Sequence, residues 1–223
     1  MPTYYDTRGA AALTAAALAL TFFATPAFPD PPQSRDEAIA ALQHAAAGKR
    51  AEAIVWIANH GTTGDADRLH ERLRDENPAI RGYAEQGLWL LWSRSGNSDI
   101  DRLMASGVEA MQSGKLEESI GIFSQVISRR PDFAEGWNKR ATVYFLAREY
   151  RKSIADCDQV LKRNPKHFGA LSGLGQIYSA LDEDDRALEW FRRALAVNPN
   201  MAGVELQIRI LEDNLARARR RSI

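Results

Sequence analysis

The chain has 223 residues, which is enough for one large domain or two small ones with a developed apolar core. Its 29 basic and 29 acidic residues cancel, so no net charge draws nucleic acid or anionic lipid to the chain as a whole. The hydrophobic content of 45% excludes an intrinsically disordered chain and suits a compact, mostly helical protein. The single cysteine, Cys157, excludes an internal disulfide, a zinc cage of several cysteines and a dithiol redox pair.

The first 27 residues have the pattern of a secretory signal peptide. Residues 10–24 carry no charge and no helix breaker, and small residues follow them at Thr25 and Ala27. This apolar run is shorter than the roughly 20 residues that span a bilayer. We therefore expect cleavage after Ala27 and export to the periplasm of a bacterium. Asp6 offsets the positive charge of Arg8, which leaves an uncleaved inner-membrane anchor as the alternative.

Residues 28–34 read FPDPPQS and predict a short, stiff linker, and residues 35–99 predict about four helices in two hairpins. In the second region, RDENPAIRGYAEQGLWLL places a proline at a helix start with an apolar face behind it. This segment resembles a HEAT repeat. An earlier copy precedes it at a constant shift along the chain, with matching positions at Asp36 and Asp67, Leu42 and Leu73, Arg50 and Arg81, Ala53 and Ala84, and Ile57 and Leu88.

The second half of the chain repeats at a regular interval of about 34 residues. Prolines mark the interval at Pro131, Pro165 and Pro199. Further positions keep the same register: Leu103, Trp137 and Leu171; Gly107, Ala141 and Gly175; Ala110, Tyr144 and Tyr178; Ser119, Ser153 and Ala187; Phe123, Cys157 and Phe191; and Val126, Val160 and Ala194. This pattern resembles three tetratricopeptide repeats, at residues 100–133, 134–167 and 168–201 of the region 100–201. The resemblance implies an all-α fold, an α-solenoid that winds as a right-handed superhelix of helix-turn-helix units.

Packing explains why such a pattern recurs. Small residues at the helix crossings let paired helices approach closely, and large side chains such as Trp137 and Phe191 fill the flanking space. Each proline ends a second helix and starts the turn to the next repeat. Because the first repeat needs a neighbour on its N-terminal side, we expect residues 35–99 to cover it in one continuous solenoid.

Residues 202–223 predict a capping helix followed by an arginine-rich tail. The helix carries one apolar stripe on an otherwise polar surface, formed by Val204, Ile208, Leu211 and Leu215. For the tail, two interpretations stay open. It is either a solvated helix end or a contact for phosphate or anionic lipid.

We predict no catalytic, cofactor-binding or metal-binding site, because the reactive residues do not cluster along the sequence. The four histidines are scattered, at His44, His60, His70 and His167. The acidic run at residues 182–185 suits a helix N-terminus, with cation binding as the alternative. Cys157 takes the place of a bulky apolar residue in its repeat, so we expect a buried, unreactive thiol.

The resemblance also implies a concave face, formed by the first helix of each repeat, that holds a peptide or helix of a partner protein. By register its lining would be Asp101, Met104, Val108 and Met111, then Asn138, Lys139, Thr142 and Phe145, then Ser172, Gln176 and Ser179. Relatives that clamp the acidic tails of heat-shock chaperones carry basic residues here, whereas this sequence keeps only Lys139. Methionine and phenylalanine suit an apolar anchor, but Met104, Met111 and Phe145 suit packing between neighbouring first helices equally well.

These features predict a non-enzymatic adaptor of the cell envelope, which binds another protein and takes no cofactor, nucleic acid or small-molecule substrate. Membrane association is expected only if the N-terminal segment stays uncleaved. One alternative is a periplasmic chaperone that binds many exported clients. Another is an enzyme or metal-binding protein whose site forms between the two helical halves from His60, His70 and Asp99.

Overall fold

The computed structural model describes residues 31–221, and over these residues the chain is helical, without a strand. The all-α prediction is therefore confirmed. The helices are α1 (Arg35–Ala41), α2 (Ala47–His60), α3 (Ala66–Arg72), α4 (Pro78–Ser93), α5 (Ser98–Gln112), α6 (Leu116–Arg129), α7 (Ala134–Leu146), α8 (Tyr150–Arg163), α9 (Phe168–Ala180), α10 (Asp184–Val197) and α11 (Ala202–Arg221). A 3-10 turn, Thr63–Asp65, precedes α3. The predicted signal peptide and the first residues of the predicted linker lie outside the described residues.

The four N-terminal helices form two hairpins in one shared register. The shift along the chain from the start of α1 to the start of α3 equals the shift from the start of α2 to the start of α4. In the first hairpin, Arg50 Nη1 donates to the carbonyls six and five residues before it, at 2.9 and 2.8 Å. Arg81 Nη1 makes the same two bonds in the second hairpin, at 2.9 and 3.3 Å. The shift seen in the sequence thus corresponds to a repeated structural unit.

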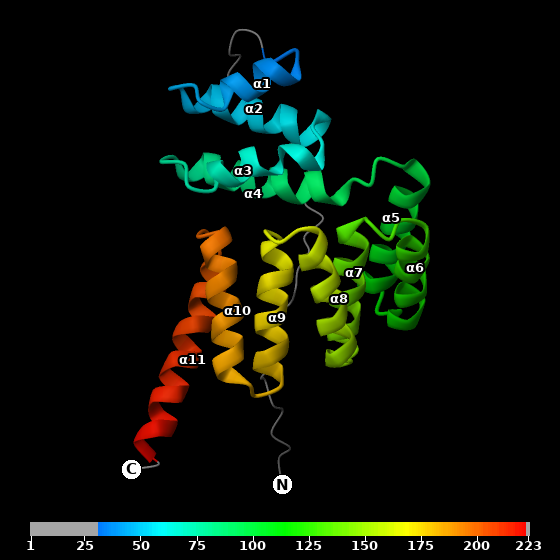
Figure 1. Cartoon of the computed structure of the whole chain (residues 1–223), viewed down its shortest axis with the longest axis vertical. Coiled ribbons are helices and arrows are strands. Elements are labelled where there is room, and N and C mark those ends of the chain that lie inside the picture. The colour runs from blue at the N-terminus through cyan, green and yellow to red at the C-terminus, as the bar shows by residue number, and fades with distance from the viewer. Residues whose placement is uncertain (1–30, 222–223) are drawn as a thin grey trace.

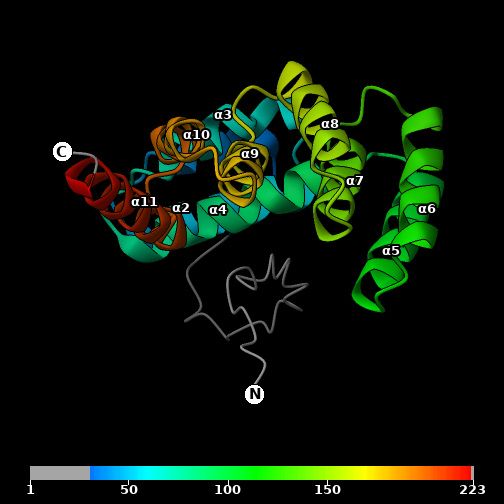
Figure 2. The same ribbon diagram turned by 90° about the horizontal axis from the view of Figure 1, so that it is seen from below.

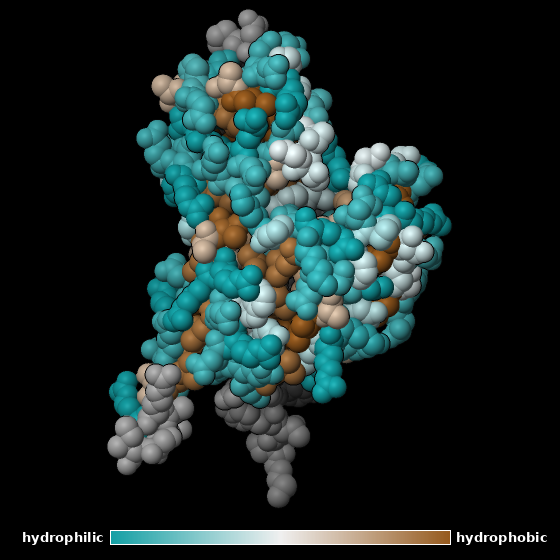
Figure 3. Space-filling model, viewed as in Figure 1, coloured by the Kyte–Doolittle hydropathy of each residue, from teal (hydrophilic) through white to brown (hydrophobic). Residues whose placement is uncertain are grey.

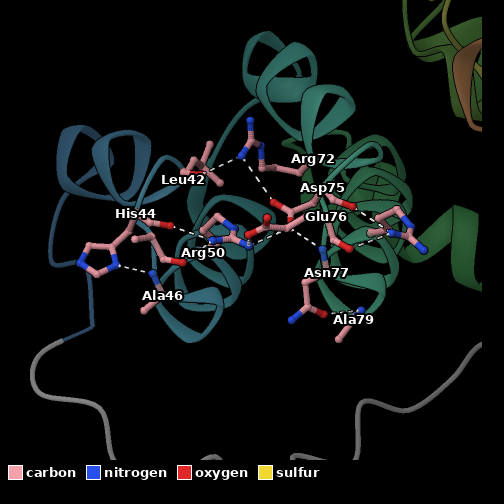
Figure 4. Close-up of polar contacts among 11 residues, drawn as sticks. Leu42, His44, Ala46, Arg50, Arg72, Asp75, Glu76, Asn77 and Ala79 are labelled. Carbon is pink, nitrogen blue, oxygen red and sulfur yellow. Dashed lines mark hydrogen bonds and ion pairs between the residues drawn. The ribbon is translucent and has the colours of Figure 1, made fainter.

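A buried ion pair joins the two hairpins (Figure 4). Arg50 Nη2 lies 2.8 Å from Asp75 Oδ1, and both residues are buried. Burial raises the pKa of Asp75, but the Arg50 guanidinium and the Asn77 amide outweigh it and hold the pKa below its usual value. Arg72 on α3 adds a hydrogen bond to the Leu42 carbonyl at 3.1 Å. Polar links therefore fix one hairpin on the other, beside a shared aliphatic core.

Three helix pairs and one further helix form the second half: α5 with α6, α7 with α8, α9 with α10, and α11 packed on α10 (Figure 1). At the first crossing a glycine makes room for a phenylalanine, since a Cβ added to Gly107 would lie 2.6 Å from Phe123. Gly175 and Phe191 meet in the same way in the third pair. Ser119 Oγ donates to the Gly107 carbonyl at 2.8 Å and ties α6 to α5. The predicted close approach at small residues is thus confirmed.

Trp137 does not fill a helix crossing, which corrects our expectation for the middle repeat. Its indole is partly exposed, and the guanidinium groups of Arg140 and Arg163 lie 5.2 and 4.9 Å from the ring centroid. Its Nε1 donates to the Pro131 carbonyl at 3.0 Å. Cys157 stands where the other two pairs have phenylalanine and is buried. The expected burial of this cysteine is therefore confirmed, and burial raises the pKa of its thiol to about 12.

The N-terminal hairpins lie across the ends of the second and third repeats rather than beside the first (Figures 1 and 2). Trp92 on α4 stacks on His167 with 4.5 Å between ring centroids, and Trp89 meets Phe168 edge-on at 5.1 Å. This differs from the expectation that residues 35–99 cover the first repeat. The physical reason is that the two tryptophans find aromatic partners at the start of α9, where the equivalent position of the first repeat is Ile100.

Polar bonds tie α3 to the turns that follow α8 and α10. Lys166 Nζ lies 2.7 Å from Asp67 Oδ1, and Asn200 Nδ2 donates to the Leu73 carbonyl at 2.7 Å. These bonds join positions 99 and 127 residues apart. Figure 3 shows that the apolar surface on this side is mainly confined to narrow bands between helices, with hydrophilic residues around them.

Candidate functional site on the inner face of the repeats

The predicted groove residues fall in three rows across α5, α7 and α9, because these helices share the register of the repeats. The first row holds Met104, Asn138 and Ser172, the second holds Val108, Thr142 and Gln176, and the third holds Met111, Phe145 and Ser179. Asp101 and Lys139 lie next to the first row along their helices. We refer to this surface as the inner face.

The first row is buried, which corrects the expectation that it lines an open groove. Met104, Asn138 and Ser172 are 6, 8 and 5% exposed. Met111 of the third row is 9% exposed and belongs to the apolar core around α5 and α6. The two methionines are therefore packing residues rather than anchors for a partner.

The second row and the rest of the third row remain partly exposed: Val108, Thr142, Gln176, Phe145 and Ser179. The ring of Phe145 lies 5.8 Å from the ring of Tyr150, so one side of it is packed while the rest stays accessible. Leu146, the last residue of α7, is 45% exposed beside it. The accessible part of the inner face is therefore its C-terminal half, along the second halves of α7 and α9 and at Val108 of α5.

Helix α4 covers the other end of the inner face. A Cβ added to Gly169, in the first turn of α9, would overlap the ring of Trp89. Trp89 also meets the ring of His167 edge-on, with 5.5 Å between centroids. The absence of a side chain at Gly169 thus leaves the space that the ring of Trp89 occupies. As a result, the protein's own α4 closes the N-terminal half of the inner face over α7 and α9, while Met104 of α5 is buried in the core around α5 and α6.

A buried carboxylate lies directly beneath this cover. Glu135 accepts hydrogen bonds from Asn138 Nδ2 and from His167 Nε2, each at 3.1 Å, and pairs with Lys139 Nζ at 3.1 Å. His167 Nδ1 accepts from the Ala170 amide, which places the ring proton on Nε2. Burial raises the pKa of Glu135, but Lys139 and His167 outweigh it and set the pKa at about 2. Glu135 is therefore ionised at neutral pH and holds the starts of α7 and α9 together.

The charged residues predicted for the inner face are both engaged by neighbours. Lys139, the one cation left from the chaperone-clamp pattern, pairs with Glu135 and is mostly buried. Asp101 Oδ1 accepts from the amide and the hydroxyl of Ser95, at 2.9 and 2.7 Å. Among the residues predicted to line the face, no unpaired cation is therefore presented to a ligand.

The residues considered for a catalytic or metal site do not converge. His60 lies at the end of α2, His70 is buried in α3, and Asp99 lies in the first turn of α5. Within residues 31–221, no three histidine, cysteine or acidic side chains are grouped so that they could hold a metal ion. Asp184 and Asp185 lie in the first turn of α10, where acids favour the helix dipole.

Sequence reasoning missed Trp89, Trp92 and Glu135, which shape the inner face as much as the predicted residues do. The available signal was a pair of tryptophans on adjacent turns of one helix, together with a glycine at the start of another. Neither feature identifies its partner, because Trp89 and Gly169 are far apart in the sequence.

Comparison with known proteins agrees with this geometry. The family described as Tetratricopeptide repeat matches residues 104–159 and 147–202. A TPR repeat-containing protein of Rhizobium etli is 33% identical over 151 residues, which are 67% of this chain and 74% of that protein. The chain belongs to the tetratricopeptide-repeat proteins. Human tetratricopeptide repeat protein 12, a more distant relative, is 28% identical over 101 residues, which are 45% of this chain and only 14% of that protein.

Solved structures share the tetratricopeptide-repeat fold over about half of the chain. The first TPR domain of Spaghetti (RPAP3), bound to the HSP90 peptide SRMEEVD, superimposes with a TM-score of 0.51 and 23% identity, covering 52% of this chain and 93% of that one. The Sgt2 TPR domain of Aspergillus fumigatus gives a TM-score of 0.53 and 20% identity, covering 56% and 83%. The α-solenoid predicted for residues 100–201 is the fold that these neighbours share.

Proposed function

We propose that this tetratricopeptide-repeat protein is a non-enzymatic adaptor that holds a peptide or helix of another protein on the open half of its inner face. The observation that carries the proposal is the contrast along that face. The half under α4 is closed by Trp89, while Val108, Thr142, Gln176, Phe145 and Ser179 stay accessible. The peptide complex of the RPAP3 domain, which has the same fold, supports a peptide as the kind of ligand.

The ligand we propose is an uncharged segment with an apolar anchor rather than an acidic tail. Lys139 is already paired with Glu135, so an incoming carboxylate would compete with an existing buried ion pair. The exposed groups around Phe145 and Leu146 are aromatic and aliphatic, and Gln176 and Ser179 provide neutral hydrogen-bonding groups. This chemistry suits an apolar side chain set between neutral polar ones.

We further propose that the protein is an exported bacterial protein of the cell envelope and that its N-terminal hairpins are HEAT-like. The signal-like pattern of residues 1–27 supports export, and the relative in Rhizobium etli supports a bacterial source. The shared register of the hairpins and the matching bonds of Arg50 and Arg81 support the HEAT-like assignment. Within residues 31–221, no helix combines the length and the apolar character needed to cross a membrane.

The test is affinity capture of partners from the envelope fraction of the host. Thr142→Arg combined with Gln176→Arg fills the open half of the inner face with bulk and charge, and we expect it to abolish capture. Val55→Arg, on an exposed position of α2, is the matched control and should capture as the wild type does. One dominant partner supports the adaptor, and a broad mixture of exported proteins supports the chaperone alternative. Equal capture by all three proteins would show that the inner face is not the binding site.

A captured partner then allows the ligand chemistry to be tested. Overlapping fluorescent peptides that span the partner are titrated with wild-type protein, and binding is followed by anisotropy. We expect the best peptide to carry an aromatic or aliphatic residue and little net charge. Strong salt dependence of a peptide rich in Asp and Glu would contradict this ligand class.

A further inference from the structure

Helix α11 carries a second apolar stripe, which is exposed, in addition to the buried stripe that packs on the last repeat. Val204 and Leu211 are buried against the preceding repeat, with Ile208 and Leu215 beside them. The opposite face of the helix, roughly 150° away by helical periodicity, exposes Leu206 and Ile210. These two residues are 50 and 43% exposed and lie one turn apart. A helix that only solvates the end of a solenoid would have polar residues there.

The charged residues beside this stripe could pair with the same residues of a second, antiparallel α11. Glu205, Arg209, Asp213 and Arg217 are all exposed, and none of them makes an ion pair within the described part of the chain. Residue 211 is the midpoint of two oppositely charged pairs, Arg209 with Asp213 and Glu205 with Arg217. A second α11 that runs antiparallel about that level would therefore place opposite charges against each other, twice each.

A hollow beside the start of α11 has the charge to receive the end of such a partner helix. It measures about 440 Å³ and lies between α4 and α11, with Arg81, Glu85, Asn200 and Glu205 in its lining. Arg81 is held by two backbone carbonyls, whereas neither Glu85 nor Glu205 has an ion-pair partner among residues 31–221. In the same antiparallel register, Arg217 and Arg220 of a second copy would reach the carboxylates of Glu85 and Glu205 in this hollow.

The dimensions of α11 leave room for the second copy. α11 has 20 residues and α10 has 14, so at 1.5 Å per residue α11 is longer by about 9 Å. In Figure 1 its end extends past the neighbouring helices. Because the packed and exposed faces are nearly opposite, the two bodies would lie on opposite sides of the helix pair and would not collide.

We propose that α11 is a self-association surface, on which two copies of this chain pair through antiparallel α11 helices. Ile210 of each copy meets Ile210 of the other near the two-fold axis, and Leu206 packs on the aliphatic stem of Arg217 of the other copy. Arg209 and Asp213 form reciprocal ion pairs. A single helix pair buries less than the roughly 1,600 Å² of a standard stable interface, so the dimer is weak and depends on concentration and salt.

Sedimentation equilibrium of the purified chain over a wide concentration range is the test. The wild type should rise from the mass of one chain toward twice that mass, and Ile210→Glu should remain a monomer. The single variants Arg209→Asp and Asp213→Arg should also remain monomeric. In each of them, position 209 of one copy would face the same charge at position 213 of the other copy, at both reciprocal contacts. The double variant Arg209→Asp/Asp213→Arg should dimerise again. Val55→Glu, a change of the same kind at an exposed position of α2, should dimerise as the wild type does.

An equimolar mixture of the two single charge variants tests the register itself. One chain then has aspartate at both positions and the other has arginine at both, so the mixture should form heterodimers although each variant alone does not. Thermal melts by circular dichroism check that all variants are folded. A wild type that stays monomeric at every concentration overturns the proposal. A dimer that Ile210→Glu and Arg209→Asp leave intact also overturns it, as does a mixture that remains monomeric.

Discussion

The N-terminal hairpins and the tetratricopeptide repeats use the same unit, a pair of antiparallel helices, but different forces hold the units together. The N-terminal hairpins are joined by a buried ion pair, Arg50 with Asp75, and by the hydrogen bond from Arg72 to the Leu42 carbonyl. Neighbouring repeats meet by close packing, with Val126 of α6 against Gly136 of α7, and the buried contact of Glu135 with His167 adds one polar link. The comparison teaches that similar helical outlines can depend on different kinds of residues, so equal substitutions should have unequal costs in the two regions.

The largest effect is expected where the two regions meet. Trp92 is 5% exposed and packs against His167 and Phe168, so Trp92→Ala should lower the free energy of unfolding by about 3 to 5 kcal/mol. Trp137→Ala should cost only about 1 to 2 kcal/mol, because that indole is partly exposed and contacts Arg140 and Arg163. Urea unfolding measures both. Equal losses would mean that the middle repeat depends on Trp137 as an interior residue.

The next effect tests the polar links of the N-terminal hairpins. Arg50→Met leaves Asp75 buried without its main partner and leaves two carbonyls unbonded, so we expect a loss of about 3 kcal/mol. Arg81→Met is the matched control at the equivalent position of the next hairpin. It removes the same carbonyl bonds but no ion pair, and it should cost less than about 1 kcal/mol. If the two variants unfold at the same urea concentration, the buried ion pair adds nothing to stability.

The third prediction concerns pH and the carboxylate under α4. Glu135 has a pKa of about 2 in the folded protein against an ordinary value of 4.5. A lowered folded pKa stabilises the protein above pH 4.5, and this contribution is lost as the pH falls from there toward 2. It amounts to about 3 kcal/mol at neutral pH. Urea unfolding of the wild type and Glu135→Gln from pH 7 to pH 3 should show a gap that narrows with acidity; a gap that stays constant would contradict the assignment.

The smallest effect compares two glycines within the first repeat. Gly107→Ala places a methyl group 2.6 Å from the ring of Phe123, which is fully buried, so we expect a loss of about 2 kcal/mol. Gly121→Ala lies on α6 with no atom within 4 Å of the added Cβ. It should raise stability by about 0.5 to 1 kcal/mol, because alanine restricts the unfolded chain. Thermal melts resolve the opposite signs, and a shared sign would argue against the tight crossing.

Much of the fold could be predicted because its signals are local or periodic. The evenly spaced prolines Pro131, Pro165 and Pro199 and the matched small residues mark the helix pairs of the repeats. A second, slightly shorter interval marks the two N-terminal hairpins. In each case the matching positions recur at a constant interval along the chain, so the helices of one unit predict those of the next.

The arrangement of the two regions could not be predicted in the same way. Trp89 meets Gly169, and Trp92 meets His167, across gaps that follow no period. These contacts decide which half of the inner face is open. The repeat register therefore could not predict that Asn138 and Ser172 are buried. Trp137 illustrates a second limit, since its place in the register suggested an interior residue until its arginine neighbours were visible.

The bonds from α3 to the turns after α8 and α10 have a consequence for how the molecule unfolds. A linear array of repeats contacts only its nearest neighbours and frays from either end. Here Asn200 bonds to Leu73 and Lys166 pairs with Asp67, so the early and late parts of the chain are fastened directly. We expect the fastened structure to melt in one cooperative step and to fold more slowly than an open array of the same length, since distant segments must meet first.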